Sequence, residues 1–124
     1  MSAPALRVFI PPLWIAAICV VIVGSLLPAA SPLMVALGRL GINDKVEHFC
    51  AYLTLSALPV IGLEDRHRAI WAAVSMFLLG VLLEGGQHFS PGRSVELGDV
   101  IANGLGVASG LLLALPIRSR IALS

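Results

Sequence analysis

The segment VFIPPLWIAAICVVIVGSLLPAASPLMVALG, residues 8–38, decides the fold class because it contains no charged side chain. A helix that spans the hydrocarbon core of a bilayer needs about 20 predominantly apolar residues. The segment is long enough for one such helix and part of a loop. Pro28 and Pro32 end the helix near Leu27, since a proline lacks the N–H that would continue it. We therefore predict a first membrane span at about residues 8–28.

The composition of the whole chain of 124 residues supports a membrane protein. Hydrophobic residues make up 58% and charged residues 12%, whereas soluble domains carry about 25% charged residues. Mean hydropathy is +0.97. The net charge is only +1 and there is no basic run, so nucleic acid is not an expected partner.

Metal and cofactor motifs are missing from the sequence. Cys19 and Cys50 both lie in apolar stretches and form no Cys-x-x-Cys pair, which favours packing over a structural zinc site. There is no phosphate loop, nucleophile elbow or His-Glu-x-x-His motif. We therefore predict neither a metal nor a cofactor.

Three further apolar stretches follow the first. The link between the second and third is Glu-Asp-Arg-His-Arg at residues 64–68, and a Pro-Gly turn lies between the third and fourth at residues 90–94. These links predict an all-α integral membrane bundle of four transmembrane helices in a single domain over residues 1–124. The predicted spans are about 8–28, 46–63, 69–88 and 99–117. A cleaved signal peptide is the alternative for the first span, although its apolar run exceeds the ~7–15 residues of such a signal.

The distribution of arginine and lysine predicts the orientation, because cytoplasmic loops carry an excess of both. With four spans, the side of the chain termini carries more of them than the opposite side. Both termini are therefore expected in the cytoplasm. The terminal side carries Arg7, Arg66, Arg68, Arg118 and Arg120, and the outer side carries Arg39, Lys45 and Arg93.

Two polar clusters contain nearly all the side chains that can do chemistry. In the first, Lys45, His48 and Tyr52 share one helix face at i, i+3 and i+7. In the second, Glu84 and Gln87 share a face near the end of the third span. The clusters are Asp44-Lys45-x-Glu47-His48-x-x-x-Tyr52 and Glu84-x-x-Gln87-His88-x-Ser90-Pro91-Gly92-Arg93, followed by Asp99 and Asn103.

The apolar stretches beside these clusters are short. Residues 49–63 and 69–83 are free of charge, and each forms only about 22 Å of helix at 1.5 Å per residue. A hydrocarbon core is about 30 Å thick. His48 and Glu84 should therefore lie below the outer headgroups and face other helices or a wet cavity. Ionisable residues in such positions are functional candidates.

Structural roles are the alternative for several polar residues. Asp44 and Asp99 are placed to cap the N-termini of the second and fourth spans. Asn103 is expected to bond to another helix, and Gly106-x-x-x-Gly110 predicts close helix packing within the chain.

Glu84 and His48 also have structural alternatives. Glu84 lies near the negative end of a helix dipole, so it needs a cation, a proton or a metal, and Arg93 is the internal cation that a Pro-Gly turn carries back. A hydrogen bond between His48 and Tyr52 would satisfy both of those side chains.

The chain resembles the VanZ-like family of small bacterial membrane proteins in three motifs. These are Asp44-Lys45-x-x-His48-Phe49-x-x-Tyr52, Glu84-x-x-Gln87-x-Phe89-x-Pro91-Gly92-Arg93 and Asp99-x-x-x-Asn103-x-x-Gly106. The resemblance implies a four-helix, multi-pass protein of the bacterial plasma (inner) membrane. It also implies kinship to a protein linked to low-level resistance to the glycopeptide antibiotic teicoplanin. His88 and the Gly85-Gly86 pair depart from the matched pattern.

We favour a cell-envelope protein that is not an enzyme and whose outer polar pocket binds an anionic lipid headgroup or a lipid-linked cell-wall precursor. Arginine offers two parallel hydrogen bonds to such an anion and lysine a point charge. Membrane lipids are then the expected partners, and the sequence predicts no oligomeric state. The expected pocket residues are Lys45, His48, Tyr52, Glu84, Gln87, Arg93 and Asn103.

Two other functions compete with lipid binding. The first is an integral-membrane enzyme acting on a lipid headgroup, in which His48 is base or nucleophile, Glu84 or Asp99 its partner, and Arg93 the charge stabiliser. A divalent metal held by His48, Glu84 and Asp99 is a variant of this enzyme. The second is a small transporter component, which is disfavoured because no span carries a charge near its middle.

Overall fold

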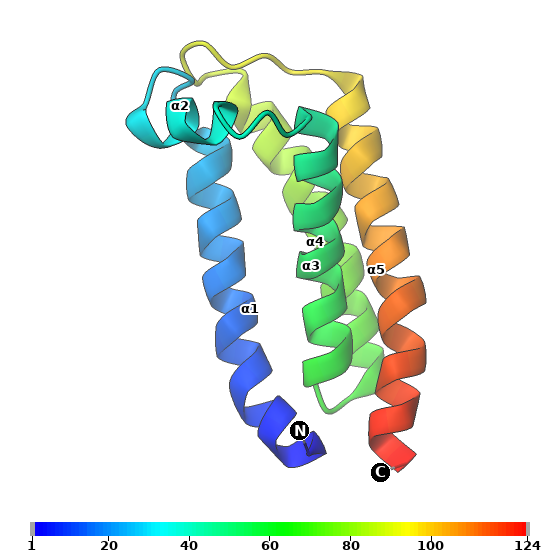
Figure 1. Cartoon of the computed structure of the whole chain (residues 1–124). Helices are drawn as coiled ribbons and strands as arrows, with labels where there is room; N and C mark the ends of the chain where they lie inside the picture. The colour runs from blue at the N-terminus through cyan, green and yellow to red at the C-terminus, as the bar shows by residue number, and fades with distance from the viewer. Residues whose placement is uncertain (1, 124) are drawn as a thin grey trace.

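The computed structural model describes residues 2–123, which form helices and no strand. Figure 1 shows the long helices side by side, with both termini at one end of the bundle and the short α2 at the other. The all-α prediction is confirmed, and the four predicted spans fall on α1, α3, α4 and α5. The helices are α1 Ala3–Leu26, α2 Pro32–Gly38, α3 Asp44–Gly62, α4 Arg66–Gln87 and α5 Leu97–Leu123.

Three helices are long and apolar enough to cross a membrane: α1, α4 and, over Leu97–Ala122, α5. The prediction of four such helices is therefore corrected to three. The exception is α3, which has only 19 residues and carries Asp44, Lys45 and Glu47 in its first turn. Because other helices cover much of α3, it requires less apolar surface than a helix that faces lipid.

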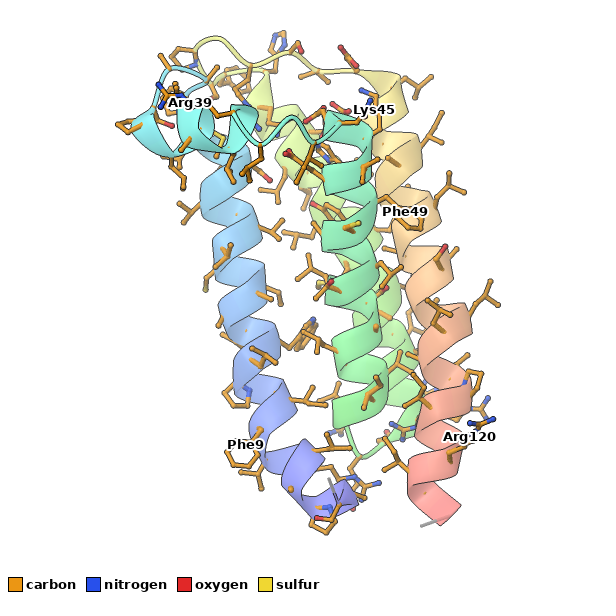
Figure 2. All side chains as sticks on the ribbon, viewed as in Figure 1. Phe9, Arg39, Lys45, Phe49 and Arg120 are labelled. Atoms are coloured by element: carbon orange, nitrogen blue, oxygen red, sulfur yellow. The ribbon has the colours of Figure 1, made fainter. Side chains whose placement is uncertain are left out.

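The outer surface of the bundle is apolar. Val20 is 70% exposed, Leu82 64% and Leu112 74%. Phe9, on α1, is 62% exposed and points away from the bundle (Figure 2). Soluble monomers rarely expose continuous apolar surface of this kind. The described residues therefore form a bundle suited to a hydrocarbon surrounding.

The backbones of α3 and α5 meet directly at two glycines. A Cβ atom at Gly106 would lie 2.5 Å from the Phe49 carbonyl oxygen, and one at Gly110 would lie 2.6 Å from that of Leu53. Only a residue without a side chain fits at such separations. The intramolecular packing predicted for Gly106-x-x-x-Gly110 is therefore confirmed.

A proline in α3 explains how α1 is attached to the bundle. Pro59 has no N–H, so the carbonyl of Leu55, four residues earlier, has no partner within the helix. The indole Nε1 of Trp14 donates to this carbonyl oxygen at 2.8 Å. The hydrogen bond satisfies the buried carbonyl and fixes α1 against the middle of α3.

Arg118 closes the other end of α3. Its Nη1 donates to the carbonyl oxygens of Val60 at 2.8 Å and Leu63 at 2.5 Å, and its Nη2 donates to that of Glu64 at 2.6 Å. These carbonyls lie at the C-terminus of α3, where the helix supplies no donors. Arg118 therefore joins α5 to the turn between α3 and α4.

The glycine contact predicts different costs for two substitutions on α5. Gly110→Ala should destabilise the protein by about 1–3 kcal/mol, because the new methyl group forces α3 and α5 apart. Gly104→Ala is the control: its Cβ would meet nothing closer than 3.5 Å, and alanine favours the helix. Unfolding of the purified protein in detergent measures both. Equal stability of the two variants would contradict the packing described.

Candidate functional site

His48 lies at the centre of the polar end of the bundle. Its Nδ1 is 2.8 Å from Oδ1 of Asn103 on α5 and 3.7 Å from Oε1 of Glu84 on α4. Because both neighbouring atoms are acceptors, we assign the ring proton to Nδ1, whose N–H then donates a hydrogen bond to Oδ1 of Asn103. The imidazole of α3 is thereby fixed between α4 and α5, with its Nε2 pointing to the other side.

Asn103 reaches His48 because a glycine leaves room on α4. A Cβ at Gly80 would lie 2.9 Å from Asn103 Nδ2 and 2.9 Å from Cε1 of Tyr52. Asn103 is 1% exposed and Tyr52 2%. The three helices therefore come together around one small residue, and the prediction that Asn103 bonds across to another helix is confirmed.

The first turns of α3 and α5 are joined by Lys45. Its Nζ donates to Oδ1 of Asp99 at 2.6 Å and to Oε2 of Glu96 at 2.5 Å. A Cβ at Gly98 would lie 2.8 Å from the Lys45 Cε, so this glycine gives the lysine stem its path. The two hydrogen bonds raise the pKa of Lys45 above its ordinary value and keep its charge at neutral pH.

Asp44, His48 and Asp99 form a cluster that we call the Asp–His–Asp triad. His48 Nε2 lies 3.7 Å from Oδ1 of Asp44 and 4.0 Å from Oδ2 of Asp99. One ligand atom from each residue lies within 4.8 Å of the other two, the spacing of groups that could hold a metal ion. Partial burial of its carboxylate, and then the neighbouring Asp99, raise the pKa of Asp44.

The N-caps differ from those predicted. Asn43 caps α3, because its Oδ1 accepts the backbone N–H of Lys45 at 2.8 Å, and Asp44 is the first helical residue. α5 begins at Leu97, so Asp99 lies inside its first turn. Because neither Asp44 nor Asp99 is an N-cap, both carboxylates are free to face His48.

Glu84 is buried beside this triad. It is 3% exposed, and its Oε2 has no hydrogen-bond partner among the described residues. The expected ion pair with Arg93 is not formed: the nearest ionisable side chain is that of His48, whose Nδ1 lies 3.7 Å from Oε1 of Glu84. α4 continues without a break through Gly85 and Gly86 to Gln87, which keeps Glu84 in regular helical geometry.

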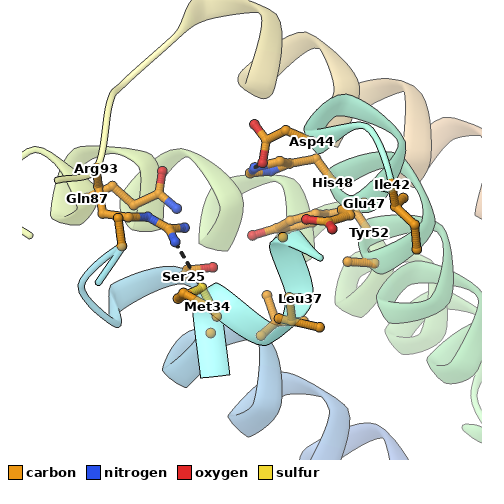
Figure 3. A pocket seen from close by; sticks show the side chains of 15 residues that line it. Ser25, Met34, Leu37, Ile42, Asp44, Glu47, His48, Tyr52, Gln87 and Arg93 are labelled. Carbon is orange, nitrogen blue, oxygen red and sulfur yellow. Dashed lines mark hydrogen bonds and ion pairs between the residues drawn. The ribbon is translucent and has the colours of Figure 1, made fainter. Parts of the chain in front are cut away.

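A cavity of about 390 Å³ opens beside the triad. In Figure 3, Arg93 and Gln87 lie on one side of it, and Asp44, His48 and Tyr52 on the other. Apolar side chains complete the wall, and two of them, Met34 and Leu37, come from α2, a helix absent from the sequence prediction. The complete lining is Val21, Gly24, Ser25, Ala29, Met34, Leu37, Gly38, Ile42, Asp44, Glu47, His48, Ala51, Tyr52, Gln87 and Arg93.

A loop pinned to the end of α1 positions Arg93. The Ala29 backbone N–H donates to the Pro91 carbonyl at 3.2 Å, and Ser90 Oγ donates to the Leu26 carbonyl at 3.0 Å. Gly92 has a φ of 75°, which only glycine adopts freely. The turn predicted from Pro91-Gly92 is therefore present and directs Arg93 into the cavity wall.

Arg93 is the cation of the cavity without a carboxylate partner. Its Nη1 donates to Met34 Sδ at 3.1 Å, the contact drawn in Figure 3, and it forms no ion pair with a carboxylate of residues 2–123. Gln87 and Tyr52 also line the cavity, and neither side chain hydrogen-bonds to a described residue. Tyr52 is therefore not the partner of His48.

The structure brings together most of the predicted site. His48, Tyr52, Gln87 and Arg93 line the cavity, whereas Lys45 is held by Glu96 and Asp99 and is not among the lining residues. Glu84 and Asn103 lie behind His48, and the hydrogen bond to Asn103 fixes the imidazole. The α2 residues Met34 and Leu37 were missed, although Ser31-Pro32 is a helix-start signal that could have revealed them.

Comparison with known proteins identifies the family. The VanZ/LLP1 family model matches residues 17–119. The chain belongs to the VanZ/LLP1 family. No curated protein and no solved structure matches the chain, so the VanZ/LLP1 assignment rests on the family model. The match covers the triad, the cavity loop and α5 as far as residue 119, and the resemblance seen in the three motifs is confirmed.

The contact of Lys45 with buried Asp99 predicts a double-mutant result. Lys45→Gln should lower the unfolding temperature, because Asp99 then keeps a buried charge without its cation. In an Asp99→Asn background the same substitution should cost much less, since no charge is left unpaired. Thermal unfolding of the four proteins in detergent measures the coupling, and additive effects would contradict it.

Proposed function

We propose that the protein binds the phosphate-bearing headgroup of an anionic membrane lipid in the cavity between α1, α2, α3 and α4. The observation that carries the proposal is the guanidinium of Arg93, which is half-buried and has no carboxylate partner among the described residues. A cation in that position is costly unless an anion joins it. Phosphate suits arginine because its oxygens accept two parallel hydrogen bonds.

Neutral groups of the cavity support the same ligand. Gln87 lies beside Arg93 in Figure 3, and its amide can donate to a phosphate oxygen. The Tyr52 hydroxyl is a further donor on the facing wall. Val21 and Ala51 line the apolar part, where the first carbons of an acyl or prenyl chain would be buried. The cavity therefore combines a headgroup site with an apolar entrance.

The acidic wall limits which headgroups fit. Asp44 and Glu47 lie opposite Arg93 and would repel a second anionic group. A headgroup with one phosphate beside Arg93 and hydroxyl groups toward Glu47 matches this arrangement. Phosphatidylglycerol has that chemistry, and polyprenyl phosphates, the lipid carriers of cell-wall precursors, share the phosphate. A link to teicoplanin susceptibility would require that the cavity accept such a precursor.

We assign the cavity to the extracytoplasmic side of the bacterial plasma membrane. Figure 1 places both termini at the opposite end, and Figure 2 shows Arg120 there, with Arg39 and Lys45 at the cavity end. The terminal end also carries Arg118 and the charged α3–α4 turn. Cytoplasmic termini agree with this excess of arginine, and the assignment has α3 cross the membrane inside the bundle, shielded from lipid by its neighbours.

Labelling of two engineered cysteines tests the orientation. In a chain with Cys19 and Cys50 replaced by alanine, Ser94→Cys should react with a membrane-impermeant maleimide in intact cells, because it lies in the cavity loop. Ser119→Cys, exposed at the other end, should react only after the membrane is opened. The reverse pattern would show that the cavity faces the cytoplasm.

Native mass spectrometry of the detergent-purified protein tests lipid binding. Wild type should retain phosphatidylglycerol or an added polyprenyl phosphate in preference to phosphatidylcholine. Arg93→Gln should reduce the retained anionic lipid by about tenfold or more, since a charged hydrogen bond is lost. Arg39→Gln is the matched control, because Arg39 is exposed at the same end and does not line the cavity.

The outcomes separate the sources of the phosphate. Retention of phosphatidylglycerol alone assigns a phospholipid, and retention of the polyprenyl phosphate alone assigns a cell-wall carrier. Equal anionic lipid on wild type and Arg93→Gln would reject the cavity as the binding site. So would equal losses for Arg93→Gln and Arg39→Gln, because the effect would then come from surface charge.

A further inference from the structure

We propose that the Asp–His–Asp triad binds a divalent metal ion through Asp44, His48 and Asp99, in the wall of the lipid cavity. The ligand atoms would be Asp44 Oδ1, His48 Nε2 and Asp99 Oδ2, which approach one another around His48 at 3.7 and 4.0 Å. Two ligands about 2.1 Å from the same ion lie at most about 4.2 Å apart. The two separations from Nε2 fall within this limit, and all three ligand atoms lie within 4.8 Å of one another, so small side-chain movements would bring them around one ion.

The tautomer of His48 supplies the first argument. Nδ1 faces two acceptors, Asn103 Oδ1 at 2.8 Å and Glu84 Oε1 at 3.7 Å. The proton of the neutral imidazole is therefore placed on Nδ1. The Nε2 lone pair is left to face Asp44 and Asp99. Three electron-rich atoms at these distances repel one another, and a cation bound between them would relieve that repulsion. Both distances from Nε2 exceed those of an N–H···O hydrogen bond.

Outer partners supply the second argument. Metal-binding histidines usually donate their other N–H to a fixed acceptor, and metal-binding carboxylates are themselves hydrogen-bonded. Asn103 does this for His48, and Lys45 does it for Asp99 by bonding Oδ1 and leaving Oδ2 toward the triad. Glu96 in turn holds Lys45 at 2.5 Å. The ligands of α3 and α5 are therefore preset in position.

Glu84 supplies an independent argument from charge. Its carboxylate is 3% exposed, lies 3.7 Å from His48, and keeps Oε2 without a hydrogen-bond partner among the described residues. Among residues 2–123, Lys45 is the one lysine or arginine that forms an ion pair with Asp44, Glu96 or Asp99. No lysine or arginine of these residues forms an ion pair with Glu84. Carboxylates outnumber cations here, so a divalent ion would offset charge that the protein leaves uncompensated.

The geometry also indicates what the ion would contact next. Asp44 and His48 line the cavity, whereas Asp99 lies behind them. Three protein ligands leave at least one coordination position, and that position would face the cavity. Such an arrangement is typical of metal sites that bind a ligand directly. One imidazole with two carboxylates suits Zn²⁺ or Mn²⁺ better than Mg²⁺ or Ca²⁺, which prefer all-oxygen sites.

Calorimetric titration tests the site without any lipid. The full chain, purified in detergent and stripped with EDTA, is titrated with Zn²⁺ and separately with Mn²⁺. Wild type should bind one equivalent of at least one of the two ions. Asp44→Asn and His48→Gln should each weaken binding by about 100-fold or more, beyond the 10–100-fold cost of losing an outer partner. Asn103→Leu should show that smaller cost.

Two variants keep the result decisive. Asp44 is exposed at the start of α3, so Asp44→Asn should fold even if His48→Gln does not, and circular dichroism checks both. His88→Gln is the matched control, since His88 is an exposed histidine at the same end outside the triad. Absence of stoichiometric binding by wild type would overturn the site. Unchanged binding by Asp44→Asn would overturn it as well.

The metal site and the lipid site fail independently. Arg93→Gln should lose anionic lipid and bind Zn²⁺ or Mn²⁺ like wild type, because Arg93 lies across the cavity from the triad. A protein that binds lipid but no ion would leave the proposed function intact and reject the metal. A protein that binds the ion but no lipid would do the opposite.

Discussion

The site depends on the backbone contact between α3 and the glycines of α5. With no side chain at Gly106 and Gly110, the two helices approach until backbone meets backbone. Asn103, about one turn toward the polar end, can then reach His48 at 2.8 Å, and Asp99, another turn on, faces Lys45 at 2.6 Å. A methyl group between the helices would separate these pairs by more than a hydrogen bond tolerates. Packing in the apolar middle thereby determines the geometry of the polar end.

Charge at the polar end follows from that geometry. Glu84 and Asp99 are both buried, where electrostatic interactions are much stronger than in water. Lys45 compensates Asp99 directly, but its contacts do not extend to Glu84. The neighbouring carboxylate of Asp44 adds to the excess, which is one reason why the pKa of Asp44 is raised. The cluster therefore has an excess of negative charge, which a cation could offset, and its open side faces the cavity.

The sequence predicted positions on helices better than contacts between them. The spacing of His48 and Tyr52 placed both on one face, and the Pro-Gly turn is present, although it brings Arg93 to the cavity wall and not to Glu84. Spacing along one helix says nothing about which residue of another helix arrives opposite. The partners of Lys45, His48 and Arg93 were therefore not foreseen: they are set by how closely α3, α4 and α5 pack. The short helix α2 was not predicted because Pro28 and Pro32 were interpreted only as the end of the first helix.

The lipid site and the metal site would strengthen each other, although each can form without the other. An anionic headgroup near Arg93 would face the carboxylates of Asp44 and Glu47 across the cavity, and their repulsion would oppose binding. An ion at the triad would offset the charge of Asp44 and Asp99 and would offer a phosphate oxygen a coordination position. Arg93 and the ion would then hold the headgroup from two sides. Because such coupling is reciprocal, a bound phosphate would also tighten the hold of Asp44 and His48 on the ion.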